Sequence, residues 1–214
     1  MKLKPGRAQS AWNPRDTYDR RSWTSGDYLP ALDALMRLLH AKDGYTVSHC
    51  RRVSKLSRLV ASTIGLEASG VHTAMVAALY HDIGKLGIVN SVLTKPGQLS
   101  PSEWRSITTH PTIGCELLES FLTVRRAAVV IQQHHESWDG SGYPFGLRQQ
   151  EILPEARVLR VCDVYDALVS DRPYRPAYTP SEAVEIITDG IGTQFEPNAA
   201  EALLSLAAEL RRAA

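Results

Sequence analysis

Cysteine is scarce in this sequence and follows no metal-binding or disulfide pattern. The 214 residues include only Cys50, Cys115 and Cys162, and no two of them form a C-x-x-C pair. Zinc ribbons and disulfide-stabilised small domains depend on closely spaced or paired cysteines, so both classes are disfavoured. We expect three buried, reduced thiols in a reducing compartment.

The sequence also lacks a long apolar run and an excess of charge of either sign. Residues 1–26 are polar and contain neither a signal peptide nor a membrane span. The 24 Lys and Arg residues nearly balance the 23 Asp and Glu residues, so the formal net charge is +1. A long nucleic acid requires a strong basic field. We therefore expect a cytoplasmic protein that binds neither membranes nor long nucleic acid.

Helical periodicity runs through most of the chain, and no convincing strand alternation occurs. Apolar residues recur at helical spacing over residues 29–39 and 47–64. Residues 71–84 are small or apolar almost all round, which predicts a helix buried on every side at the domain centre. The predicted fold class is all-α, with an N-terminal extension at residues 1–26 and one domain at residues 27–214.

Capping signals and turn residues mark the later elements. Ser100, Pro101 and Glu103 predict the start of a helix that runs to about Glu119. The stretch 138–153 is rich in glycine and proline and predicts a long ordered loop, which is a functional hint. Further helices are expected over about 122–137, 154–170, 180–190 and 197–212.

Five of the seven histidines stand among the apolar and small residues of expected helices. They are His49, His81, His110, His134 and His135. A single buried imidazole is usually a core histidine with hydrogen-bond partners, but five together favour a metal site.

Two aspartates accompany these histidines. Asp82 follows His81 at the end of the most apolar helix, and Asp163 interrupts the apolar face of another. For Asp163 the alternative is an ion pair with an arginine such as Arg160; Asp166, one turn further, is a candidate for supporting the ligands. Imidazole and carboxylate ligands suit Fe, Mn, Zn, Co or Ni, and a shared carboxylate suits a metal pair.

Two motifs closely resemble the HD-GYP domain of bacterial signalling phosphodiesterases. They are His81-Asp82-Ile83-Gly84-Lys85 and His134-His135-Glu136-Ser137-Trp138-Asp139-Gly140-Ser141-Gly142-Tyr143-Pro144. The similarity extends from Asp43 through His110-Pro-Thr-Ile-Gly and Asp171-Arg-Pro-Tyr-Arg175 to Phe195-Glu-Pro.

The resemblance implies an HD-type bundle of about seven helices with a metal site in its core. It implies that Asp82 bridges two metal ions, and that Asp82 and Lys85 are catalytic. Lys85, Tyr143, Arg172 and Arg175 would hold the substrate. The implied metal ligands are His49, His81, Asp82, His110, His134, His135 and Asp163.

The sequence departs from the family pattern at two positions. Tyr45 stands where some members carry a glutamate that supports a third metal, so we expect two metals. Glu196 replaces the usual aspartate before Pro197, but it keeps the charge and the helix-capping role. Glu136, Trp138 and Asp139 are expected to shape the loop and to orient ligands.

The implied activity is hydrolysis of cyclic di-GMP to the linear dinucleotide in bacterial second-messenger signalling, with further cleavage to GMP left open. The cofactors would be two divalent ions per chain, Fe or Mn in the first place, with Zn, Ni and Co also compatible. The alternatives are a cyclic-dinucleotide receptor or interaction module with little turnover, and a phosphohydrolase acting on another nucleotide such as cyclic GMP-AMP. No regulatory domain is visible, so a homodimer built on residues 1–40 or a regulatory partner protein remains open.

Overall fold

The computed structural model describes residues 29–171 and 176–213, the last four of these by their backbone alone. The expected extension at residues 1–26, and with it the domain boundary, therefore lies outside the described residues, as do Arg172 and Arg175. The described part is all-α, as predicted, and contains no strand; its one β-type contact is an isolated bridge between Ile191 and Phe195.

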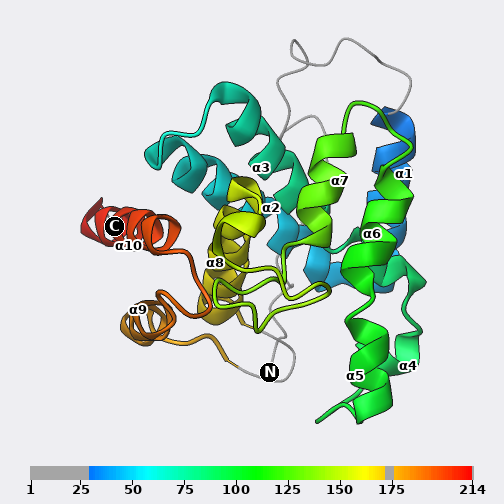
Figure 1. Cartoon of the computed structure of the whole chain (residues 1–214). Coiled ribbons are helices and arrows are strands. Elements are labelled where there is room, and N and C mark those ends of the chain that lie inside the picture. The colour runs from blue at the N-terminus through cyan, green and yellow to red at the C-terminus, as the bar shows by residue number, and fades with distance from the viewer. Residues whose placement is uncertain (1–28, 172–175, 214) are drawn as a thin grey trace, which may run out of the picture.

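Helices α2 (Gly44–Thr63), α3 (Ala68–Tyr80) and α8 (Pro154–Val169) pack against one another in the middle of the molecule (Figure 1). Helix α1 (Leu29–Lys42) lies against α2, whose first turn is capped by Asp43: its Oδ1 accepts from the backbone N–H groups of Tyr45 and Thr46. Seven of the thirteen residues of α3 are buried, which confirms the central helix expected from its composition.

The helix expected from Ser100 to about Glu119 is divided in two. Helix α5 (Pro101–Ile107) has the predicted capping box, but the chain then turns at Thr108 and Thr109 before α6 (His110–Leu118). Pro111 has no N–H and suits a first helical turn better than a helix interior, which explains the new start. The break aims His110 inward instead of leaving it on a continuous helix surface.

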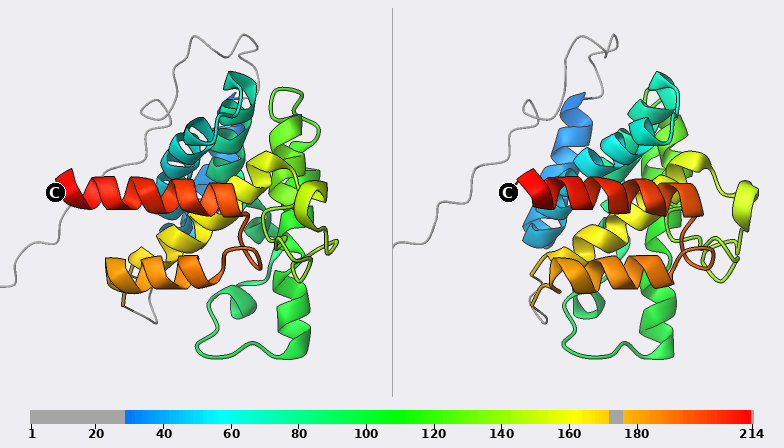
Figure 2. Two further views of the ribbon diagram at one scale, coloured as in Figure 1. Left: turned by 60° about the vertical axis from the view of Figure 1, so that its left-hand side comes forward. Right: turned by 90° about the vertical axis from the view of Figure 1, so that its left-hand side faces the viewer.

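Helix α7 (Arg125–Gln132) packs on α3 and α6, and the short helix α4 (Asn90–Leu93) lies beside α5. The expected loop at 138–153 is present and contains one 3₁₀ turn, Gln149–Glu151. Helices α9 (Pro180–Asp189) and α10 (Pro197–Ala213) run side by side and both contact α8 (Figure 2).

All three cysteines are buried and free, as expected. The departure at Glu196 also behaves as predicted, because its carboxylate accepts from the backbone N–H of Ala199 at 2.6 Å in the first turn of α10. No helix in the described ranges combines the length and the apolar character needed to cross a bilayer.

Candidate metal centre

The sequence His81-Asp82 lies where α3 ends. The chain leaves the α-helix at Tyr80 and continues as the 3₁₀ turn Ile83–Gly87, termed η3. Gly84 lets this turn approach α6 closely: a Cβ atom there would lie 1.9 Å from the carbonyl oxygen of His110. The close backbone contact brings Asp82 next to His110 although the two are far apart in sequence.

One group of possible metal ligands joins α2, α3 and α8. Ligand atoms of His49, His81 and Asp163 lie within 4.8 Å of one another, and all three residues are at least largely buried. The Nε2 atom of His49 is 2.9 Å from Asp163 Oδ1, and that of His81 is 3.6 Å from the same oxygen. These three side chains converge on one point and can hold one cation.

A second group joins α6 with the segment that follows α7. Ligand atoms of His110, His134 and His135 also lie within 4.8 Å of one another. The Nε2 atoms of His110 and His134 are 3.3 Å apart, and the rings of His134 and His135 have centroids 4.0 Å apart. Three imidazoles at this separation can hold a second cation.

Asp82 stands between the two groups. Its Oδ2 is 3.5 Å from Nε2 of His81 in the first group, and its Oδ1 is 3.5 Å from Nε2 of His110 in the second. Each carboxylate oxygen therefore faces a different histidine group. This is the arrangement in which one carboxylate can bridge two cations.

Backbone carbonyls orient three of the histidines in the same way. The Nδ1 atom of each ring lies 2.6–2.8 Å from the carbonyl oxygen of the residue three positions earlier. Nδ1–H donates to that oxygen, so the lone pair of Nε2 points into the site. The pairs are His81 with Ala78, His110 with Ile107, and His134 with Ile131.

His49 is oriented by a carboxylate instead. Its Nδ1 lies 2.7 Å from Asp166 Oδ2, and Arg52 grips the same carboxylate with Nε at 2.7 Å and Nη2 at 2.9 Å. Asp166 thus supports a predicted ligand without facing the site. The expectation for Asp166 is confirmed in geometry.

The electrostatics of the site suit cation binding. Burial favours the neutral acid, but Lys85, His81 and His110 outweigh it and hold the pKa of Asp82 well below its ordinary value. Burial also lowers the pKa of His110, to about 4, and that of His134 well below 6.5. An ionised carboxylate and neutral imidazoles are the protonation states that metal ligation needs.

His49 and His81 behave differently from those two histidines. Burial lowers the pKa of His49, but the hydrogen bonds to Asp163 and Asp166 prevail and raise it to about 9. Burial likewise lowers the pKa of His81, but the charge of Asp82 prevails and holds it well above 6.5. The bond to His49 holds the pKa of Asp163 well below its ordinary value, against the effect of burial. A cation held by these side chains would displace the protons, so ligation there would release them.

The residues predicted to hold substrate are partly described. Lys85 is 2.8 Å from Asp82 Oδ2 and so is already paired in this structure. The ring of Tyr143 stacks on His135 with centroids 4.8 Å apart and lines a hollow with Thr108, Thr109, Thr112, Ile113, Glu116 and Pro144. The hollow therefore adjoins the second histidine group.

Glu136 shapes the loop that carries Tyr143. This carboxylate is buried and accepts from the backbone N–H groups of Phe145 at 2.7 Å and Leu147 at 3.0 Å. These two hydrogen bonds agree with the expected role of Glu136 in shaping the loop. Trp138 contributes through its ring, over which the guanidinium of Arg157 lies at 5.2 Å.

Sequence reasoning missed Arg160 as a site residue. Its Nη1 lies 3.1 Å from His135 Nδ1, and it forms no ion pair with Asp163 within 4.0 Å. The pairing considered as an alternative for Asp163 is thus wrong in this structure. Its spacing in the sequence could have indicated this position, because a residue three places before Asp163 lies on the same face of α8. Cys50 was also missed; its Sγ is 3.7 Å from His81 Nδ1.

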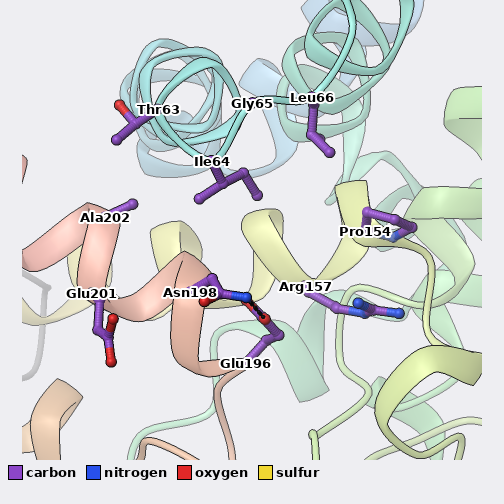
Figure 3. A pocket seen from close by; sticks show the side chains of 10 residues that line it. All are labelled: Thr63, Ile64, Gly65, Leu66, Pro154, Arg157, Glu196, Asn198, Glu201 and Ala202. Atoms are coloured by element: carbon purple, nitrogen blue, oxygen red, sulfur yellow. Dashed lines mark hydrogen bonds between the residues drawn. The ribbon is translucent and has the colours of Figure 1, made fainter.

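A second groove lies elsewhere, between the turn after α2 and the start of α10. Figure 3 shows Arg157 and Glu196 at its floor, with Asn198 hydrogen-bonded to Glu196 at 2.9 Å. None of the predicted metal or substrate residues lines it. The groove is therefore separate from the histidine and aspartate cluster.

An all-α fold in which six histidine and aspartate side chains gather around a central carboxylate is that of a helical domain with a candidate metal centre. The sequence profile of the HD domain family matches residues 33–199, and the chain belongs to that family. The resemblance to HD-GYP proteins is thereby confirmed at the level of the family.

Among curated proteins, the chain is 40% identical over 183 residues to the cyclic di-GMP phosphodiesterase response regulator RpfG of Xanthomonas campestris, covering 85% of this chain and 48% of that protein. It is 35% identical over 170 residues to the 3'3'-cGAMP-specific phosphodiesterase 3 of Vibrio cholerae, covering 79% and 37%. The chain thus spans about half or less of the length of these relatives.

Two solved structures share the fold. A cyclic GMP-AMP specific phosphodiesterase of V. cholerae, V-cGAP3, superposes with a TM-score of 0.64 at 19% identity, covering 83% of this chain and 48% of that one. The HD domain of the L. monocytogenes phosphodiesterase PgpH in complex with cyclic-di-AMP gives 0.59 at 20% identity, covering 84% and 96%. At this level of identity the likeness concerns the fold alone.

Proposed function

We propose that this chain is a metal-dependent phosphodiesterase that hydrolyses a cyclic dinucleotide, cyclic di-GMP in the first place, to the linear dinucleotide. The observation that carries the proposal is the position of Asp82, with one oxygen toward each of two histidine groups. A centre of this kind takes two divalent cations, and the nitrogen and oxygen ligands favour Fe or Mn. The proposed ligands are His49, His81, Asp82, His110, His134, His135 and Asp163.

When bound, the two metals would supply a water of lowered pKa and positive charge for the phosphate oxygens. The chain itself holds the ligands rigid: backbone carbonyls lock three rings, and Asp166 locks the fourth. Helices α2, α7 and α8 pack against α3, and His81 and Asp82 at its end are buried. A pre-oriented ligand set limits the reorganisation needed during the reaction.

The substrate has room beside the second histidine group. The hollow next to Tyr143 can accommodate part of a dinucleotide, and the ring of Tyr143 is held against His135 in a position to contact a base or a sugar. Lys85 is adjacent to Asp82 and can offset charge on a phosphate oxygen. Arg172 and Arg175 stay predicted phosphate or base contacts.

The relatives support this substrate class by their names, which specify cyclic di-GMP phosphodiesterases and cGAMP-specific phosphodiesterases. Cyclic GMP-AMP is therefore the second candidate substrate. All seven proposed ligands are present, which disfavours a receptor without turnover. Three buried free thiols fit the proposed cytoplasmic location.

The test is metal analysis and turnover on one preparation. Purified protein is analysed for bound metal by mass spectrometry and incubated anaerobically with Mn or Fe(II) and cyclic di-GMP or cyclic GMP-AMP. We expect about two metals per chain and a linear product, with the larger kcat/KM for cyclic di-GMP. Asp82→Ala should lose both. Metal without turnover on either substrate would contradict the enzyme assignment, and no metal would contradict the site.

A further inference from the structure

Beside the proposed metal centre, Arg160 has a largely shielded guanidinium that the proposed ligand set does not explain. It lies on α8, three residues before Asp163, and its Nε is shielded from solvent with no hydrogen-bond partner. Its single hydrogen-bond contact is with Nδ1 of His135. No carboxylate among the described residues forms an ion pair with it.

A guanidinium that is shielded from water and forms no ion pair is destabilising, because its desolvation is not fully offset by an opposite charge. Two other cations near the site have carboxylate partners: Lys85 pairs with Asp82, and Arg52 pairs with Asp166. For Arg160, attraction to Asp163 offsets only part of the effect of burial, and the pKa of the guanidinium is lowered. A charge that is only partly compensated at this place indicates an anion that arrives from outside.

The contact with His135 uses only one nitrogen of the guanidinium, Nη1. Nε is buried without a partner, and Nη2 forms no hydrogen bond with the described residues. Arg160 therefore keeps two adjacent N–H donors that can bind one anion while Nη1 stays on His135.

We propose that Arg160 is a phosphate-binding residue of this site, placing its guanidinium on a non-bridging oxygen of the scissile phosphodiester next to the His110, His134 and His135 group. This inference rests on the proposed function and adds a substrate contact to it. A guanidinium presents two parallel N–H donors that match two phosphate oxygens, which an ammonium cannot do. Lys85 beside Asp82 and Arg160 beside His135 would then both contact the phosphate.

Two variants and a matched control test the assignment. Arg160→Gln removes the charge and Arg160→Lys keeps it without the paired donors. Arg58→Gln removes an exposed arginine of α2 that has no part in the proposed site or in the loop at 138–153. Its variant therefore reports the general effect of replacing an arginine by glutamine in this chain.

The first measurement is thermal unfolding of the metal-free full chain with and without inorganic phosphate. Without phosphate we expect Arg160→Gln to raise Tm, because an uncompensated buried charge disappears. Phosphate should raise the Tm of the native chain and of Arg58→Gln but not that of Arg160→Gln. A lower Tm for Arg160→Gln would show a structural role, and equal or absent phosphate shifts would also overturn the proposal.

The second measurement is kcat/KM for cyclic di-GMP with Mn. Arg160→Gln should lower it at least about tenfold, the loss of one charge-assisted hydrogen bond, and Arg160→Lys should recover part of it. Arg58→Gln should stay within about twofold of the native value. An unchanged value for Arg160→Gln would overturn the proposal. If the native chain is inactive on cyclic dinucleotides, the proposed function fails, and the phosphate measurement still decides the role of Arg160.

Discussion

Asp166 shows how much a single residue outside the ligand set can contribute. It accepts from His49 Nδ1 and from the guanidinium of Arg52, so it orients the ring with Nε2 toward Asp163 and helps to raise the pKa of the imidazole. Neither effect can be inferred from the identities of the proposed ligands alone. Hydrogen-bond partners of metal-bound histidines commonly contribute strongly to metal affinity.

Asp166→Asn should therefore weaken metal binding by about 10–100-fold, because the amide supports the ring less well and loses the charge. Titration of the apoprotein with Mn, followed by calorimetry, measures the change in Kd. Asp189→Asn is the control, since Asp189 lies exposed at the end of α9 and should leave Kd unchanged. Equal affinities for all three proteins would show that Asp166 does not position His49.

At the scale of elements, the site depends on how closely η3 and α6 approach. Gly84 has no space for a side chain: a Cβ there meets the backbone of both His110 and Gly114, at 1.9 and 2.6 Å. Backbone atoms cannot move aside as a flexible side chain can. The contact brings Asp82, before η3, to His110 at the start of α6.

Gly84→Ala should separate η3 from α6, lower the free energy of unfolding by about 1–3 kcal/mol and reduce the bound metal. Chemical denaturation and metal analysis measure the two effects. Gly70→Ala is the control. Its added Cβ has no neighbour closer than 3.5 Å, and alanine stabilises helix α3 by up to about 1 kcal/mol relative to glycine. A Gly84→Ala protein with native stability and metal content would refute the close-contact argument.

The start of α5 offers a pH-dependent element at a distance from the metal ligands. Glu103 accepts from the Lys95 ammonium and from the backbone N–H of Ser100, both at 2.6 Å, and these bonds lower its pKa from 4.5 to about 2. Because the pKa of Glu103 is lower in the folded than in the unfolded chain, its ionised carboxylate stabilises the fold at pH values above 4.5. This stabilisation is lost as the pH falls from 4.5 to about 2.

The difference in Tm between the native chain and Glu103→Gln should thus be largest above pH 4.5 and shrink toward pH 2. Glu119→Gln, an exposed position after α6, serves as the control and should show no such trend. Thermal unfolding at a series of pH values measures both differences. A constant difference for Glu103→Gln across the series would contradict the ion pair and cap described for α5.

At the scale of the whole molecule, the core contains the carboxylates and imidazoles that we propose as ligands of two cations. Asp82 and Asp163 are ionised beside the central helix, and five imidazoles surround them. Cations that bind only the folded chain stabilise it by mass action, about 2.7 kcal/mol at a concentration of 100 Kd. The stability of the domain should therefore be coupled to metal.

Chelation should lower Tm, and addition of Mn should restore it in proportion to the logarithm of its concentration. Differential scanning calorimetry of the chelated and reconstituted protein measures this shift. Asp82→Ala should respond much less to Mn, because the carboxylate shared by both histidine groups is gone. A native Tm that is independent of chelator and of Mn would contradict a metal-stabilised core.

The sequence by itself determined the helical class, the central position of α3 and the seven candidate ligands. Apolar periodicity is a local property, and a histidine or aspartate among apolar residues is conspicuous without coordinates. The family motifs added the bridging role of Asp82, which agrees with its two 3.5 Å approaches to histidine. Those approaches join segments that are distant in the chain.

Only the tertiary structure decided how the seven candidates divide into two groups, and which other residues support them. The break between α5 and α6 and the contact at Gly84 depend on packing between helices, which local patterns do not encode. Arg160 could be read from sequence as a partner of Asp163, yet its guanidinium turns to His135. A helical residue has several neighbours within reach, and the direction of its side chain is settled by the elements packed around it.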